Sequence, residues 1–213
     1  MKCASIWDRV SVVILLAAFV GMLALYGRLS ERIPSHFDIH GNVDATLPRA
    51  VGAFVMPVFG LGVWGLVRFG AYLLPGGWRD RLRASPVGPA AACVLALLFA
   101  LHVIMIHAAL AGRTEAAALL GLTLSGFWFV MGLVLPRVRR NPFIGIRTTW
   151  TLTSDENWAR THRIGAIAFV LAGVLGLFAA ALGAFWLVVA AILVSAVVPV
   201  VYSYLLARRQ RAM

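Results

Sequence analysis

The chain is poor in the side chains on which most enzymes and soluble proteins rely. Charged residues make up only 13% of its 213 residues, and Cys3 and Cys93 are its two cysteines. One cysteine lies near the amino terminus and the other inside an apolar stretch, so neither a disulfide framework nor a cysteine metal cluster is supported. The sequence also lacks a convincing nucleophile or phosphate-binding loop. We therefore predict no enzyme, with no catalytic residue, no cofactor and no resident metal.

Apolar residues, by contrast, dominate the chain. They account for 62% of it and give a mean hydropathy of +0.90, which is typical of integral membrane proteins. Because they form long blocks rather than short alternating segments, we expect spanning helices and no barrel. The net charge of +11 comes mostly from arginines that flank these blocks. It therefore indicates topology and a lipid bilayer as partner, with no direct binding of nucleic acid.

The blocks predict an all-α, polytopic membrane protein, a bundle of six transmembrane helices. A span needs roughly 20 apolar residues to cross a hydrocarbon core about 30 Å thick. The predicted spans are Val10–Gly27, Ala50–Leu74, Ala90–Ala111, Ala116–Leu135, Ile164–Leu182 and Ala184–Leu206. The first is interpreted as a retained anchor, because its apolar run is longer than that of a signal peptide. Residues 112–115 and Gly183 make the two tight connections. We divide the chain into an amino-terminal two-helix unit, residues 1–74, and a carboxyl-terminal four-helix unit, residues 75–213.

The distribution of Lys and Arg predicts the orientation of the spans. With the amino terminus inside, most basic residues fall in inside segments, as the positive-inside rule requires. Both termini are then cytoplasmic. The two long loops face opposite sides of the membrane, with residues 28–49 outside and residues 136–163 in the cytoplasm.

The outer loop contains residue types that order a turn. Pro34 fixes its own φ angle, and Gly41 with the following Asn favours a tight turn with positive φ. His36, Asp38 and His40 alternate along the chain, so on an extended strand all three side chains would face the same side. Asp44 could complete a site with them. They fit a metal such as zinc. A turn stabilised by hydrogen bonds of Asp and His would use the same residues, so both interpretations stay open.

The cytoplasmic loop contains a helix-start signal. Thr153, followed three residues later by Glu156, forms a capping-box pattern, which predicts that the fifth helix begins before the membrane. Trp158 and His162 then fall on neighbouring positions of one helix face. Trp158 is predicted to mark the membrane interface.

Upstream of that start, Gly145 and Arg147 form a second feature of the loop. Glycine permits a flexible turn, and the arginine beside it presents a fork that binds carboxylate or phosphate. A lipid phosphate is the simplest partner for an arginine at a cytoplasmic membrane edge.

Two groups of residues form recognisable motifs. The first comprises Asn141, Gly145, Ile146, Arg147, Trp150, Thr151, Leu152, Ser154, Trp158, Thr161, His162 and Arg163. The second comprises Ile33, Pro34, His36, Gly41 and Asp44. With these motifs the chain resembles the SdpI family of bacterial multi-pass membrane immunity proteins, in its carboxyl-terminal signature and its small amino-terminal domain respectively. One departure is Arg28-Leu29-Ser30 ahead of the second motif, where the family more often has a Leu-Pro turn.

The resemblance implies a protein of the bacterial cytoplasmic membrane that protects the cell from a secreted, membrane-active peptide toxin. For some members it also implies signalling to a cytoplasmic repressor protein. The predicted layout is compatible with both partners. The outer loop or the spans would meet the toxin, while the cytoplasmic loop organises the helices or contacts a protein.

Two other functions stay open. A small transporter or ion pathway is favoured by His102 near the middle of the third span and by kinks expected at Pro57 and Pro199. His107 lies about 140° around the helix from His102, so the two histidines do not share a face. A metal-dependent membrane enzyme would instead use the His and Asp side chains of the outer loop.

Overall fold

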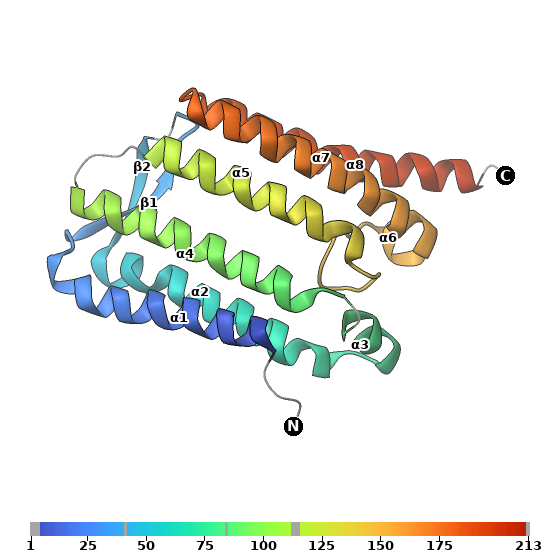
Figure 1. The fold of residues 1–213 in the computed structure, drawn as a ribbon, viewed down its shortest axis with the longest axis horizontal. Coiled ribbons are helices and arrows are strands. Elements are labelled where there is room, and N and C mark those ends of the chain that lie inside the picture. Colours follow the sequence, from blue (N-terminus) through green and yellow to red (C-terminus); the bar gives the residue numbers. More distant parts are fainter. Residues whose placement is uncertain (1–4, 41, 84, 112–115, 212–213) are drawn as a thin grey trace.

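Six long helices, lying alongside one another in alternating directions, form the body of the molecule in a computed structural model (Figure 1). The structure describes residues 5–40, 42–83, 85–111 and 116–211. The long helices are α1 (Ile6–Leu25), α2 (Arg49–Phe69), α4 (Val87–Ala111), α5 (Ala116–Val134), α7 (Asp155–Ala181) and α8 (Phe185–Arg211). Each is long and apolar enough to cross a membrane. The prediction of a polytopic bundle with six spanning helices is therefore confirmed.

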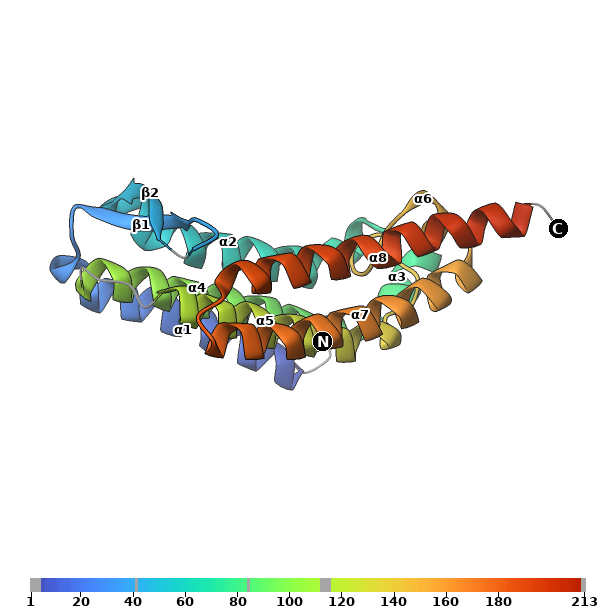
Figure 2. The same ribbon diagram turned by 90° about the horizontal axis from the view of Figure 1, so that it is seen from above.

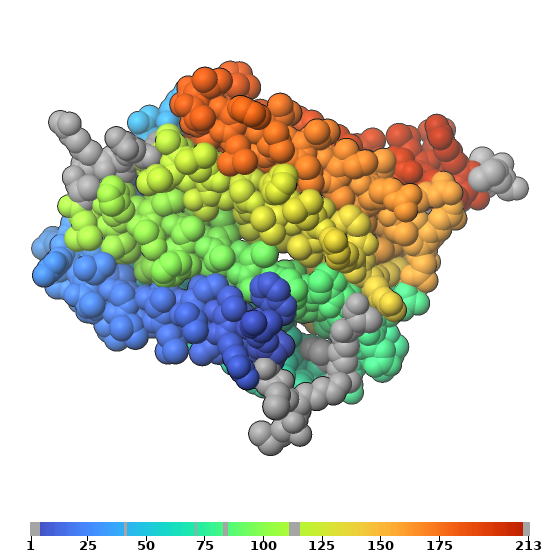
Figure 3. Space-filling model, viewed as in Figure 1, coloured from blue at the N-terminus to red at the C-terminus, as the bar shows by residue number. Residues whose placement is uncertain are grey.

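Large apolar side chains cover the outside of this bundle. Leu171 and Phe178 of α7, for example, are 56% and 68% exposed. Helices α1, α4, α5 and α7 lie side by side across one face of the molecule (Figure 3). Apolar side chains exposed along whole helices fit a lipid environment, because water would make such a surface unstable.

Inside the bundle, one pair of helices approaches almost backbone to backbone. A Cβ atom on Gly173 of α7 would lie only 2.7 Å from the backbone nitrogen of Phe129 in α5, so the position accommodates no side chain. On the other side of α5, helix α4 packs against α1 and α2 as well. The third span therefore connects the two halves of the chain.

The outer loop, predicted only as an ordered loop, contains two strands. Strand β1 (Arg32–Phe37) pairs antiparallel with β2 (Val43–Pro48). The register is irregular around His36. Gly41, which was predicted to form the turn, lies outside the described residues. Asp38 shapes the described part of the turn by accepting hydrogen bonds from the amides of His40 and Asn42, each at 2.8 Å. The bond from the Asn42 amide lowers the pKa of Asp38 below its ordinary value.

Strand β1 is anchored to the helices by one side chain. Ile33 is completely buried and belongs to an apolar cluster with Met22 of α1 and Met105 of α4. A Cβ atom on Gly52 of α2 would lie 2.8 Å from the Cβ atom of Ile33, so β1 rests directly on α2. Burial of this kind fixes the hairpin on the ends of three helices.

The hairpin and the long polar segment lie at opposite ends of the molecule (Figures 1 and 2). Two short helices that were not predicted, α3 (Gly76–Arg83) and α6 (Thr149–Thr153), lie at the polar end together with the carboxyl terminus. Gly183, at φ +72°, forms the predicted turn between α7 and α8. Residues 112–115, the other predicted tight connection, lie outside the described residues. Short 3-10 turns occur at Tyr26–Arg28, Gly70–Leu73 and Leu135–Arg137.

Candidate functional site

Buried polar side chains gather at one end of the bundle, where the segment between α5 and α7 folds against α7 and α8. We define six of them as the polar cluster: Asn141, Thr151, Asn157, Thr161, His162 and Ser203. Each is at most 1% exposed. Buried polar groups in a membrane protein are costly unless they are hydrogen-bonded, and they often mark function. The cluster is therefore the leading candidate site.

Asn141 builds the turn that begins this segment. Its side-chain oxygen accepts hydrogen bonds from the amides of Phe143 and Ile144, each at 2.8 Å. Its side-chain nitrogen donates to the carbonyl oxygen of Arg139 at 2.8 Å. A single buried side chain thus replaces the hydrogen bonds that an irregular backbone would otherwise lack.

His162 joins the segment to α7 and has one defined tautomer. Its Nε2 atom accepts a hydrogen bond from the amide of Ile146 at 3.1 Å, and its Nδ1 atom lies 2.8 Å from the carbonyl oxygen of Trp158. Because an amide only donates and a carbonyl only accepts, the proton must be on Nδ1 and the ring is neutral. Protonation of Nε2 would break the bond to Ile146.

Trp158 stacks on His162 with ring centroids 4.1 Å apart, and its Nε1 atom donates to the carbonyl oxygen of Val138 at 2.8 Å. It is only 3% exposed. Trp158 is therefore buried in the protein, and its position at the membrane interface stays a prediction. Its indole nitrogen finds a partner inside the protein instead of among headgroups.

Gly145 is the position at which the segment passes this stacked pair. Its φ angle is +114°, a conformation that residues with a side chain rarely adopt. A Cβ atom there would collide with Nε2 of His162 and lie 3.0 Å from the Trp158 ring. Both the backbone conformation and the contact therefore require glycine.

Helix α6 is capped by two threonines and packs on α8. The side chains of Thr148 and Thr151 form a reciprocal capping box, and the Thr151 hydroxyl also donates to the carbonyl oxygen of Ile146 at 2.8 Å. The Trp150 ring packs on Tyr204 of α8 with centroids 5.1 Å apart. These contacts place the segment against the last span.

The predicted capping box of Thr153 and Glu156 is wrong by one residue. Ser154 caps α7, its side chain accepting from the amide of Asn157 at 3.2 Å. Thr153 still belongs to α6, where its hydroxyl donates to the carbonyl oxygen of Thr149, and Glu156 pairs with Arg160 at 2.8 Å. The extended backbone that a cap requires first occurs at Ser154. The fifth span nevertheless begins well before Ile164, as expected.

The start of α7 is fastened to α8 inside the cluster. The side-chain nitrogen of Asn157 donates to the carbonyl oxygen of Ser203 at 2.9 Å. Its oxygen accepts from the Thr161 hydroxyl at 3.1 Å. The Ser203 hydroxyl lies 3.2 Å from that of Thr148. Sequence reasoning missed Asn157 and Ser203, although small polar residues on apolar helices were a usable signal.

The basic members of the predicted site, Arg147 and Arg163, lie at the surface. Both side chains are exposed. Arg147 donates from Nη1 to the carbonyl oxygen of Pro142 at 2.7 Å, which steadies the turn below it. Neither arginine belongs to the buried cluster, so both are accessible to headgroups or to a protein partner.

A set of ion pairs that sequence reasoning missed attaches α3 to this end. Asp155 lies 2.6 Å from Nη1 of Arg81 and 2.7 Å from Nε of Arg140. The guanidinium carbons of these two arginines lie 6.0 and 5.5 Å from the ring centroid of Trp78. We call this group the Asp155 clamp. Arg81 lies 74 residues before Asp155, so no local spacing predicts the contact.

The polar residues at the outer end form a pair and a turn. Nδ1 of His36 lies 2.6 Å from Asp44, while Asp38 accepts the backbone amides of the turn. In the described ranges, which omit Gly41, no group of three or more His, Cys, Asp and Glu side chains is placed to hold one metal ion. The geometry thus favours the hydrogen-bonded turn of the two interpretations.

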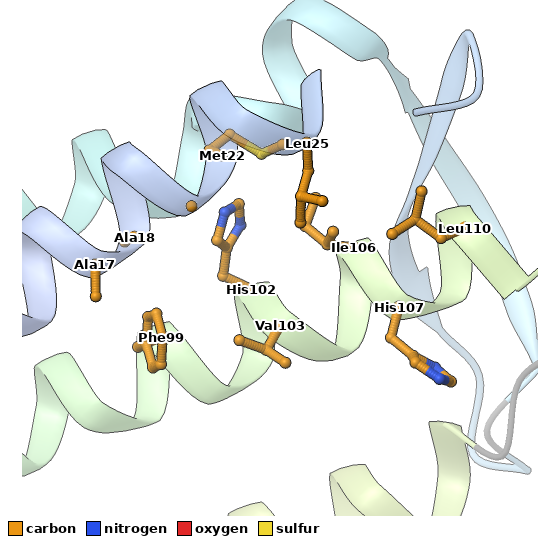
Figure 4. Close-up of a pocket in the computed structure, with 11 residues that line it drawn as sticks. Ala17, Ala18, Met22, Leu25, Phe99, His102, Val103, Ile106, His107 and Leu110 are labelled. Carbon is orange, nitrogen blue, oxygen red and sulfur yellow. The ribbon is translucent and has the colours of Figure 1, made fainter. Parts of the chain in front are cut away.

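A pocket of about 260 Å³ lies between α1 and α4, and Figure 4 shows its lining. His102 lies on the α4 side, faces α1, and is 4% exposed. Its Nδ1 atom has no hydrogen-bond partner among the described residues. His107 also lines the pocket but points away from His102, so the two histidines do not share a face, as predicted (Figure 4).

Six apolar spans with a buried, hydrogen-bonded polar cluster at one end define a multi-pass membrane protein. The chain is similar to the SdpI family of membrane proteins in two separate segments. The SdpI/YfhL protein family matches residues 137–203, and the Domain of unknown function (DUF1648) matches residues 13–61. A similar curated protein is "Immunity protein SdpI" of Bacillus subtilis (strain 168), 25% identical over 165 residues, which are 77% of this chain and 76% of that protein. No solved structure matched.

Each matched range includes one of the two ordered polar regions of the structure. Residues 137–203 run from the end of α5 to Ser203 and contain every member of the polar cluster. Residues 13–61 contain the β-hairpin and most of α1 and α2, two of the three helices on which it rests. The resemblance seen in the sequence is confirmed.

Proposed function

We propose that this chain is a non-enzymatic immunity protein of a bacterial cytoplasmic membrane, which protects the cell from a secreted, membrane-active peptide. Its similarity to a protein named for immunity supports this role. In the same proposal the polar end contacts a cytoplasmic regulator, the repressor implied for some relatives.

The hydrogen bonding of the polar cluster is the observation that carries the proposal. Both ring nitrogens of His162 are bound to the backbone, and the hydroxyls of Thr151 and Thr161 donate to protein oxygens. Groups engaged in this way hold a shape and are not presented to a substrate. That supports recognition or signalling over general acid-base catalysis.

We further propose that the polar end and both termini face the cytoplasm and that the hairpin faces outward. Exposed Arg147, Arg163, Arg208 and Arg209 lie on the polar side, in agreement with the positive-inside rule. A phosphatase that is active only outside the cytoplasm should then be active when inserted at Asn42 and inactive when fused to the carboxyl terminus. The reverse pattern would contradict the orientation.

Expression in a bacterium that is sensitive to a secreted membrane-active peptide tests the immunity role. We expect growth at peptide concentrations that kill cells with an empty vector. Arg147→Ala should weaken protection or its regulation, whereas Arg209→Ala, the same charge change at the end of α8, should not. Absence of resistance to every peptide tried, together with parental behaviour of Arg147→Ala, would end the proposal.

A second function, a small transporter or ion pathway, is supported by one observation. His102 lies in a spanning helix with an unpartnered, buried Nδ1 atom beside the α1–α4 pocket, and ionisable groups at such depth often mark ion or substrate pathways. Flux into liposomes containing the purified protein measures this activity. A flux that His102→Ala leaves unchanged would remove the residue-level support.

We also keep the division between residues 74 and 75 as a proposal. It is supported by α3, which begins at Gly76 and attaches through Arg81 to Asp155 in the second unit. Residues 1–74 and 75–213, expressed as two separate chains, should copurify from membranes through the contacts of α4 with α1 and α2. Failure of the two chains to copurify would place the boundary elsewhere.

A further inference from the structure

A groove of about 590 Å³ opens beside the polar cluster, and it has a strongly basic lining. Arg81, Arg137, Arg139 and Arg140 all line it. We call it the arginine groove. Its lining also includes Trp158, one of the stacked pair at the centre of the family signature.

The groove has more positive charge than its own residues neutralise. Asp155 is the one carboxylate in the lining, and it is shared by Arg81 and Arg140. Within the described part of the chain, no carboxylate lies within ion-pair distance of Arg137 or Arg139. Two guanidinium groups fixed on one carboxylate, with two more beside them, form a site for an anion.

The position of the groove indicates which anion. Arg137 ends one candidate span, Ala116–Arg137, and Asp155 begins another, Asp155–Ala181. The groove therefore lies at the level where the hydrocarbon core gives way to headgroups. Val138 and Trp158 provide apolar lining next to the arginines. A lipid glycerophosphate, which joins an anionic group to acyl chains, has the same combination of chemistry.

We propose that the arginine groove binds the phosphate of an anionic phospholipid headgroup. Arg137 and Arg139 contact the phosphate, while Arg81 and Arg140, held on Asp155, present a preorganised second pair of donors. This site does not depend on the immunity role. It gives the Asp155 clamp a binding purpose, because α3 contributes Arg81 to the groove only when it is docked.

Native mass spectrometry of the delipidated full-length protein tests the proposal, with phosphatidylglycerol and phosphatidylcholine titrated in one detergent. We expect preferential binding of phosphatidylglycerol. The double variant Arg137→Gln/Arg139→Gln should bind it about 30-fold more weakly, if each arginine near an anionic lipid contributes about 1 kcal/mol and 1.4 kcal/mol is tenfold. The matched double variant Arg208→Gln/Arg209→Gln, with equal loss of charge at the end of α8, should bind like the parent.

Three results would overturn the proposal. The first is equal binding of the two lipids, and the second is equal weakening of phosphatidylglycerol binding by both double variants. The third is displacement of bound lipid by hexaglutamate in the absence of any lipid preference, which would indicate an acidic protein partner. Glycerol phosphate distinguishes a free phosphate from a lipid, because it should compete only at far higher concentration. The Arg137→Gln/Arg139→Gln variant without lipid should melt within a few degrees of the parent, which verifies that it folds. If it does not, the single variant Arg139→Gln is used in its place.

Discussion

Replacing Asn141 by alanine tests whether hydrogen bonds hold the polar end together. The change removes the acceptor for the part-buried amides of Phe143 and Ile144 and leaves both without a partner. Each unsatisfied buried group costs roughly 1–3 kcal/mol. The two together should lower the free energy of unfolding by about 2–6 kcal/mol. At about 2–4 °C per kcal/mol for a chain of this size, the melting temperature should fall by about 4–24 °C.

Thermal unfolding of the purified variants in one detergent, followed by tryptophan fluorescence, measures this fall. Asn42→Ala is the matched control, because its side chain makes one exposed hydrogen bond to Asp38 and its loss should change the free energy of unfolding by no more than about 0.5 kcal/mol. If Asn141→Ala and Asn42→Ala have the same melting temperature, the argument that unpaired amides destabilise the polar end is refuted.

Three further predictions use the same preparations. Gly145→Ala should destabilise the protein more than Gly183→Ala by about 1–3 kcal/mol, because both glycines have positive φ but only Gly145 has a close buried contact. Equal melting temperatures of the two variants would show that this contact does not matter for stability. Asp155→Asn should speed tryptic cleavage within α3 about fivefold with little change in melting, since exposed ion pairs contribute up to about 1 kcal/mol; unchanged cleavage would mean that the clamp does not hold α3. Ile33→Ala should cost about 2–5 kcal/mol and speed hydrogen exchange of the hairpin, whereas exposed Val43→Ala should do neither.

The spans could be predicted because bilayer thickness imposes a length on each apolar helix. The predicted block Ala116–Leu135 and the observed α5, Ala116–Val134, differ by one residue for that reason. The two long loops lie at opposite ends because an odd number of spans separates them. Their assignment to the outside and the cytoplasm stays a prediction, as does the functional role of the signature residues.

Local signals failed where tertiary contacts decided the outcome. The usual preference of tryptophan for headgroups gives no hint of the carbonyl oxygen at Val138, which accepts a hydrogen bond from the indole nitrogen of Trp158 inside the protein. Thr153 has the right spacing for a cap, yet α6 extends through it. Arg81 and Asp155 meet only because the bundle brings distant segments together. Contacts of that kind have no signature in a single sequence.

Two hydrogen-bond contacts at Ser203 join the last span, α8, to both α6 and α7. The serine backbone is bound to Asn157 at the start of α7, and its hydroxyl touches Thr148 at the start of α6. About 30 Å of helix separates Ser203 from the Gly183 turn at the other end of α8, at about 1.5 Å per residue. A tilt of α8 near that turn would therefore displace α6 and the start of α7 together.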